Sequence, residues 1–213
     1  RDSYLAAARH DPDHPMPYWG MAHAMGPNPN SRYSGMPDDP KGEGFKAIKK
    51  AMDRIENASD MEAKLIQALH TLYDKDTYPD AKRRDQVYLA EMRKLNRDYP
   101  NDPDIAALYA SSYMSIQRWN YWDDQGEPIS ETLAVAEALE RIMSKDLSHP
   151  GVLHLHIHLI EASAEPERAL VAADNLEKTI PIVGHVVHMP SHIYVRVGQY
   201  QKAVEQNLSL IHI

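Results

Sequence analysis

The chain has no cysteine among its 213 residues. Disulfide bonds and thiolate metal ligands are therefore excluded, and any metal ion would have to be held by imidazole, carboxylate or water. Positive charge is also scarce, since 23 Lys and Arg face 31 Asp and Glu for a formal net charge of −8. This balance argues against a nucleic-acid-binding surface. No apolar run approaches the roughly 18 residues of a membrane-spanning helix, so we expect no membrane span.

The two ends of the chain give little information about where the protein works. No basic and then apolar leader is visible, and the chain begins at Arg1 instead of a methionine. We therefore expect a fragment truncated at both ends and infer no compartment. The last six residues, LSLIHI, are what the end of a common transposon-based library adapter encodes in this frame. We expect residues 208–213 to be a non-native tail, and His212 is left out of the site.

Apolar residues recur at helical spacing along most of the chain, and no segment alternates as a strand would. Three such stripes are Phe45, Ile48, Met52 and Ile55; Tyr88, Met92, Leu95 and Tyr99; and Val135, Leu139 and Ile142. Ser59 with Glu62 three residues later predicts a capping box, and Pro166 suits a first helical turn. Pairs such as DP, YP, HP and IP predict helix ends. The pattern therefore predicts short helices in antiparallel pairs.

An internal repeat connects the last third of the chain with the segment before it. A shift of 34 residues places His192 on His158, His188 on His154 and Ala203 on Ala169. This is the period of tetratricopeptide repeats, which are helical hairpins. The stretch VGQYQKAVEQN also carries the spacing of a small residue, an aromatic and an alanine that is typical of that repeat's turn and second helix.

Three blocks, YWGMAHAMGPNPN, HPGVLHLHIHLIEAS and GHVVHMPSHIYVRVGQY, resemble segments of a group of bacterial tetratricopeptide-repeat (TPR) proteins. The resemblance extends to about Asn207. It implies an all-α fold, a right-handed α-solenoid of about five TPR-like antiparallel helix pairs forming one domain over residues 1–207. The segments NPNSRYSGMPDDPKGEG and RWNYWDDQGEPIS depart from the repeat rhythm. Proteins of this kind are generally scaffolds, so the resemblance implies a fold more than an activity.

The stretch GHVVHMPSH places His185, His188 and His192 on one face of a helix, at spacings of three and four residues. Pro190 makes this prediction conditional. A proline inside a helix removes a backbone hydrogen bond and bends the axis, which would move His192 relative to the other two.

The preceding repeat has a matching stripe of His154, His158 and Glu161, whereas His156 points to another side of the helix and is excluded. Equivalent helices of neighbouring repeats pack side by side in a solenoid, so the two stripes are expected to converge. The candidate metal ligands are therefore His158, Glu161, His188 and His192 first, with His154 and His185 as further ligands or supporting residues.

Such a cluster has three interpretations. Neutral imidazoles suit zinc, copper, iron or nickel, and two histidines beside a carboxylate suit non-haem iron or hydrolytic zinc; on this interpretation the cofactor would be one divalent transition metal. Alternatively, histidines on repeat helices are ordinary hydrogen-bonded residues inherited with the repeat. The third interpretation is a groove whose histidines become charged together near pH 6.

Two functions remain open at this stage. One is an interaction scaffold whose concave groove binds a protein or peptide partner of basic or neutral character. The other is a metal-dependent enzyme in which Glu161 serves as a ligand or as a base acting on metal-bound water. H-E-x-x-H, serine-nucleophile, phosphate-loop and dinucleotide motifs are absent from the sequence. The aromatic and acidic stretch WNYWDD is predicted to be a loop that contacts a partner or covers a groove.

Overall fold

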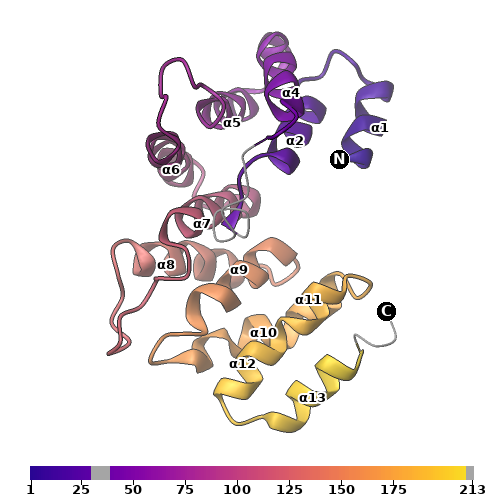
Figure 1. The fold of residues 1–213 in the computed structure, drawn as a ribbon. Helices are drawn as coiled ribbons and strands as arrows, with labels where there is room; N and C mark the ends of the chain where they lie inside the picture. The colour runs from indigo at the N-terminus through magenta and orange to yellow at the C-terminus, as the bar shows by residue number, and fades with distance from the viewer. Residues whose placement is uncertain (30–38, 210–213) are drawn as a thin grey trace. The chain divides into compact units, whose positions relative to one another are not determined.

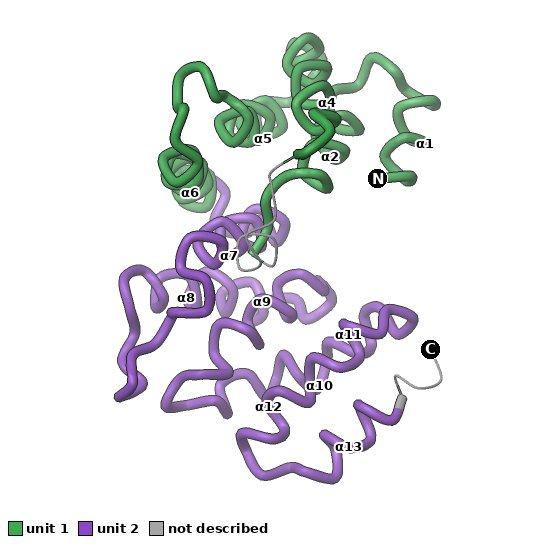
Figure 2. Tube along the Cα trace, viewed as in Figure 1, with its two compact units in different colours: residues 1–98 green, residues 99–213 purple. Residues whose placement is uncertain are grey.

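The fold is all-α, as the sequence predicts. The computed structural model describes residues 1–29 and 39–209, and within these ranges every regular element is a helix (Figure 1). The described chain divides into two compact units, unit 1 over Arg1–Asp98 and unit 2 over Tyr99–Ile213 (Figure 2). None of the helices seen in these ranges is both long enough and apolar enough to cross a membrane.

Unit 1 is built from helices that pack as neighbours along the chain. They are α1 (Asp2–His10), α2 (Met16–Met25), α4 (Glu43–Met52), the short 3-10 helix η1 (Ile55–Asn57), α5 (Asp60–Thr71) and α6 (Ala81–Asp98). Helix α2 packs on α1, α4 and α5, and α5 packs on α6. The core between them includes Ile48, Ile66, Leu69 and Met92, all buried. The amphipathic stripes of the sequence thus supply this core.

The capping box at Ser59 is confirmed. The hydroxyl of Ser59 accepts a hydrogen bond from the backbone N–H of Glu62, and the Glu62 carboxylate accepts one from the backbone N–H of Ser59. Both contacts satisfy donors at the start of α5 that the helix itself leaves unpaired.

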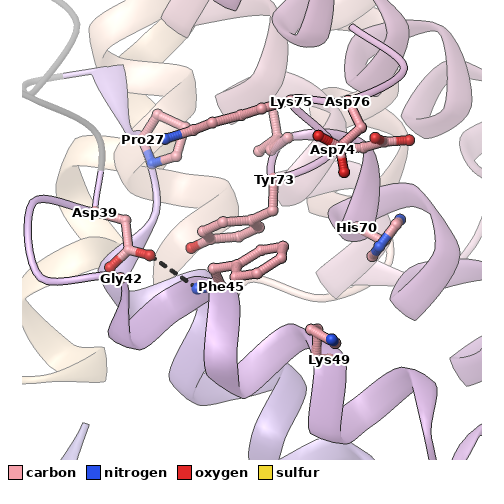
Figure 3. Close-up of a pocket in the computed structure, with 11 residues that line it drawn as sticks. Pro27, Asp39, Gly42, Phe45, Lys49, His70, Tyr73, Asp74, Lys75 and Asp76 are labelled. Atoms are coloured by element: carbon pink, nitrogen blue, oxygen red, sulfur yellow. Dashed lines mark hydrogen bonds between the residues drawn. The ribbon is translucent and has the colours of Figure 1, made fainter. Parts of the chain in front are cut away.

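One predicted core residue of unit 1 is exposed instead. Phe45 is 43% exposed, because the buried face of α4 is formed by the smaller residues Ala47, Ile48 and Ala51. The rings of Phe45 and Tyr73 form part of the wall of a cavity of about 550 Å³ within unit 1 (Figure 3). Its wall also carries the charged residues Asp39, Lys49, Asp74, Lys75 and Asp76.

Unit 2 consists of helical hairpins that stack on one another. Its elements are α7 (Pro103–Gln117), α8 (Thr132–Met143), α9 (Pro150–Ile160), the 3-10 helix η2 (Pro166–Ala169), α10 (Leu170–Thr179), α11 (Gly184–His188), α12 (Pro190–Arg196) and α13 (Tyr200–Ser209). Helix α9 packs on α7, α8, α10 and α12, and α13 packs on α11 and α12. Helix α9 is therefore central to this unit.

Several prolines that were predicted to end helices instead begin them. Pro103 and Pro150 are the first residues of α7 and α9, where a missing N–H costs nothing. Asp102 and His149 cap these helices by accepting a hydrogen bond from the backbone N–H of the third helical residue. Pro100 and Pro181 do follow the ends of α6 and α10.

The repeat features occupy comparable places in unit 2. Ala169 and Ala203, which the 34-residue shift superposes, are both buried. Gly198 adopts a positive φ of 77° in the turn between α12 and α13, a conformation that favours glycine. Neither the handedness of a solenoid nor a single domain over residues 1–207 follows from these features, and both stay predictions.

Two segments singled out in the sequence extend beyond the described residues. Residues 30–38 of the Pro/Gly-rich stretch lie outside the described residues, and so do residues 210–213 of the predicted non-native tail. Leu208 is still part of α13.

Candidate metal centre

All six predicted ligands lie together in unit 2. His154 and His158 are on α9 with Glu161 as its C-terminal cap, His185 and His188 are on α11, and His192 is on α12. The two histidine stripes therefore meet although they are separated by more than twenty residues of chain.

The break at Pro190 does not separate the second stripe. Helix α11 ends at His188 and α12 begins at Pro190, with Met189 between them in helical conformation. Their axes remain close enough that the rings of His188 and His192 are 4.8 Å apart, centroid to centroid. Met189 and Ile193 are fully buried beside them, and this burial holds both short helices in place.

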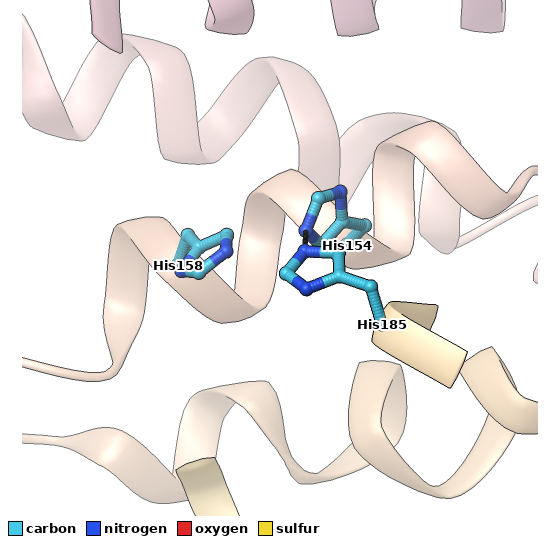
Figure 4. A group of neighbouring side chains, drawn as sticks. All are labelled: His154, His158 and His185. Atoms are coloured by element: carbon cyan, nitrogen blue, oxygen red, sulfur yellow. Dashed lines mark hydrogen bonds between the residues drawn. The ribbon is translucent and has the colours of Figure 1, made fainter. Parts of the chain in front are cut away.

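The first part of the cluster, formed by His154, His158 and His185, consists of imidazoles alone. The Nε2 atoms of His154 and His185 are 3.0 Å apart, and the dashed line in Figure 4 marks this contact between α9 and α11. The His158 ring lies one helical turn from His154, with its centroid 4.8 Å away. Burial lowers the pKa of His154 to about 3, with a smaller contribution from neighbouring histidines. The pKa of the more exposed His185 is lowered by partial desolvation and by its histidine neighbours. Both rings are therefore neutral at physiological pH, the state in which a histidine binds metal.

Glu161 joins this part of the cluster to the second part, which contains His188 and His192. One carboxylate oxygen, Oε1, lies 3.2 Å from His158 Nδ1, and the other, Oε2, lies 2.5 Å from His192 Nδ1. Burial tends to raise the pKa of Glu161, but the hydrogen bonds with the two histidines outweigh it and lower the pKa to about 2. The Glu161 carboxylate is thus ionised at any pH at which the protein would work.

A chain of hydrogen bonds fixes the tautomers of the second part. The side-chain amide nitrogen of Asn207 donates to the carbonyl oxygen of Ala203 at 2.7 Å, so its amide oxygen is the atom that lies 2.8 Å from His188 Nδ1. An amide oxygen only accepts hydrogen bonds, so His188 Nδ1 carries the proton. In neutral His188 the other nitrogen, Nε2, is then an acceptor, and it lies 2.9 Å from His192 Nε2.

The consequence appears at His192. Its Nε2 must be the donor to His188, so a neutral His192 has an unprotonated Nδ1. That lone pair faces the Glu161 carboxylate oxygen at 2.5 Å. At this distance a proton or a metal cation lies between the two atoms. The proton makes the contact a short charge-assisted hydrogen bond, one of those that lower the pKa of Glu161, and a metal cation would replace it.

Two sets of side chains bring three ligand atoms within 4.8 Å of one another. One set is His154, His158 and His185, and the other is His158, Glu161 and His192. Solvent reaches the cluster, since His185 is exposed and the side chain of His192 is 30% exposed. His188 belongs to neither set. Its Nε2 atom contacts His192 Nε2, the ring nitrogen of His192 that does not face Glu161.

The remaining histidine of α9 lies elsewhere. His156, excluded on the sequence pattern, is fully buried on the α8 side, where its Nε2 lies 3.1 Å from Oε1 of Glu140. Arg168 donates to the same oxygen. The hydrogen bond with His156 and the charge of Arg168 lower the pKa of Glu140 despite partial burial. His156 therefore joins α8, α9 and η2 and has no contact with the cluster.

Two residues near the cluster were not assigned to the site from the sequence. Trp119 packs edge-on against His158 with the ring centroids 4.7 Å apart, and Asn207 reaches His188 from α13. Trp119 is placed by an unusual backbone, because Arg118 and Trp119 both have positive φ, 51° and 72°. The repeat spacing carries no signal for either contact, since both depend on how separate elements pack.

The WNYWDD loop is tied to unit 2 by its aromatic residues. Trp122 donates from its indole nitrogen to the carbonyl oxygen of Leu159 at 2.6 Å, near the end of α9. Tyr121 is buried against Tyr113. Trp119 thus covers one side of His158, and the predicted contact of this loop with a partner stays a prediction.

The comparisons with known proteins leave the family open. No family model matches the chain, and a search of curated proteins finds no match. The likeness to TPR proteins therefore remains a resemblance of sequence blocks.

Proposed function

We propose that this chain is a TPR-like helical-repeat protein that binds a divalent transition metal through His158, Glu161 and His192. The observation that carries the proposal is the contact between His192 Nδ1 and the Glu161 carboxylate. When His192 is neutral, the hydrogen-bond chain to Asn207 leaves a lone pair on that nitrogen, and when His192 is protonated the same nitrogen donates to the ionised carboxylate. A bound cation would take the place of that proton and use both atoms as ligands.

The two contacts of Glu161 have spacings near those of ligands of one ion, and all three ligand atoms lie within 4.8 Å of one another. Ligand atoms about 2.0 to 2.1 Å from a tetrahedral zinc ion are about 3.4 Å from one another. His158 Nδ1 already lies 3.2 Å from Glu161 Oε1, and the His192 contact would open by less than about 1 Å. Two imidazoles and one carboxylate suit zinc or ferrous iron and leave a position for water.

An open position is typical of catalytic metal sites, so this proposal includes a metal-dependent enzyme as its functional class. Metal-activated water would be the nucleophile of hydrolysis, and Glu161 would act as a ligand. The right-handed TPR-like solenoid belongs to the same proposal. It is supported by the 34-residue offset of the two stripes and the matching places of Ala169 and Ala203.

The direct test is the metal content of a Glu161→Gln/His192→Ala variant. Wild-type protein purified without chelator and dialysed against a limited excess of Zn²⁺ should retain zinc, because neutral nitrogens and a carboxylate hold it. The variant should lose the ion bound by these residues, measured by elemental analysis per chain. Circular dichroism should show unchanged helix content, since neither side chain forms the core.

His149→Asn provides the matched control. It removes a histidine of the same helix that lies outside the cluster, while asparagine retains the capping acceptor at the start of α9. This control should keep the wild-type metal content. Wild-type protein that retains no zinc would overturn the proposal, and so would a double variant whose zinc content equals that of the wild type.

Asn207 should influence metal affinity without touching the ion. In Asn207→Leu the only contact left at His188 Nδ1 among the described residues is the longer one with the hydroxyl of Ser191 at 3.4 Å. A hydroxyl can donate or accept, so the His188 tautomer is no longer fixed, and His192 Nδ1 spends part of its time protonated and unable to bind. Supporting residues of this kind typically change metal affinity about 10- to 100-fold. Competition with a chromogenic zinc chelator measures the loss, and ¹⁵N shifts of the His192 ring report the tautomer.

Asn175→Leu is the matched control for this prediction. Asn175 makes the same type of contact, from its amide nitrogen to the carbonyl of the residue four earlier, but lies on α10 away from the histidines. Asn207→Asp keeps an oxygen acceptor and should retain most of the affinity. An unaltered zinc affinity in Asn207→Leu would show that the chain of hydrogen bonds does not prepare His192.

A peptide-binding scaffold is the second candidate function. The cavity of unit 1 favours it, because apolar walls with Phe45 and Tyr73 lie beside charged groups of both signs. An extended peptide with apolar and basic side chains suits such a surface. Binding of such a partner should survive a chelator, as measured by pull-down with and without EDTA. Release on chelation and recovery on adding zinc would contradict a metal-independent scaffold.

A further inference from the structure

His158 is the one residue shared by the two sets of ligands. Its Nδ1 atom lies 3.2 Å from Glu161 Oε1 and so faces the second set. An imidazole has two ring nitrogens that point in different directions, and after losing both ring protons it can bind one cation at each. The position of His158 therefore raises the question of a second ion.

The remaining side chains of the first set are free of competing partners. For His154 and His185, the only hydrogen-bond partner of each ring among the described residues is the other ring. Their Nε2 atoms are 3.0 Å apart, close to the separation of about 3.4 Å between two ligands of one tetrahedral ion. Neither ring is committed to a carboxylate, in contrast to His156 and His192.

The two rings also meet in a suitable orientation. Their planes are 88° apart and their centroids are separated by 5.0 Å, so the nitrogens converge instead of stacking. They come from different helices, α9 and α11, and the His158 ring lies on the same side of α9 (Figure 4). An ion between them would hold α11 against α9.

We propose that the cluster binds two divalent metal ions bridged by the imidazolate of His158. Nδ1 of His158 binds one ion together with Glu161 and His192, and Nε2 binds the other together with His154 and His185. Binding the second ion displaces the remaining ring proton of His158, which passes to solvent. This inference rests on the proposed function, because the ion held by Glu161 and His192 is the one proposed there.

A second ion changes what the site can do. An imidazolate bridge holds its two ions further apart than the roughly 3.5–4 Å of a two-metal hydrolytic site, so the second ion is expected to fix α11 on α9 and to bind its own water or substrate atom. Each ion here has three protein ligands, so both retain positions for water or substrate.

The experiment is a comparison of metal stoichiometry between wild type and a His154→Ala/His185→Ala variant. Each protein is titrated with Zn²⁺ and freed of loosely bound metal, and the ions per chain are counted by elemental analysis. The expected result is about two ions in the wild type and about one in the variant. His185→Gln alone serves as a second variant, because this side chain is exposed, and it should also hold about one ion.

The bridge itself is tested with copper. In Cu²⁺-loaded wild type, exchange coupling through the imidazolate should broaden or abolish the electron paramagnetic resonance signal expected of isolated ions. The His154→Ala/His185→Ala variant should give the signal of one isolated ion. Two uncoupled ions in the wild type would overturn the bridge.

The outcomes separate this inference from the proposed function. One ion in both proteins overturns the second site and leaves the first intact. No ion in either protein overturns both. Two ions in both proteins show that His154 and His185 are not ligands, which overturns the inference.

Discussion

Zinc content should fall from about two ions per chain to below about 0.2 when His158 is replaced by alanine. No other single substitution is expected to have so large an effect on metal binding, because His158 is the only member of both ligand sets. The loss of one ligand from each set leaves two protein ligands per ion, too few for a stable site in competition with water. Elemental analysis after dialysis measures the effect.

The fold must be monitored separately in this variant. His158 is 9% exposed and packs against Trp119, so alanine also removes a packing contact. His158→Phe keeps an aromatic ring beside Trp119 but offers no nitrogen, and it should lose metal as completely as the alanine variant. His149→Asn should keep both ions. A His158→Phe protein that still holds one ion would show that the remaining ligands suffice without the shared residue.

Bound metal should stabilise unit 2 strongly. An ion that binds only the folded state, at a free concentration about 1,000 times its dissociation constant, adds about 4 kcal/mol to the free energy of unfolding. For a unit of this size we expect the melting temperature to rise by about 10 to 20 °C. Helices α9, α11 and α12 would be linked by the ions. Differential scanning calorimetry with Zn²⁺ and with excess chelator measures the shift.

The Glu161→Gln/His192→Ala variant tests the origin of this stabilisation. It removes ligands of one ion without altering unit 1, so its melting temperature should respond far less to zinc. Unit 1 contains no residue of either ligand set, and any separate transition that it shows should be independent of zinc in both proteins. Equal shifts in wild type and variant would place the stabilising ion elsewhere.

Much of the candidate site was predictable because it follows local periodicity. A spacing of four residues places His154 and His158 on one face of α9, and the capping box and the buried stripes follow the same helical geometry. The exclusion of His156 rests on this geometry too, and its contact with Glu140 agrees with it. Phe45 shows where prediction from periodicity fails. The same spacing fits two adjacent faces of α4, and the face that is buried in the fold is the one with the smaller residues.

The helical nature of the chain and the residue types that could bind an ion follow from the amino-acid sequence alone. Absent cysteines restrict the ligands to imidazole and carboxylate, and the repeat offset pairs one histidine stripe with the other. Which atoms face each other depends on how the helices pack. The carboxylate of Glu161 lies between His158 and His192, and Asn207 sets the orientation of His188. These contacts join separate helices. Their distances are set to within about an ångström by how the helices pack, and local sequence spacing carries no information about that packing.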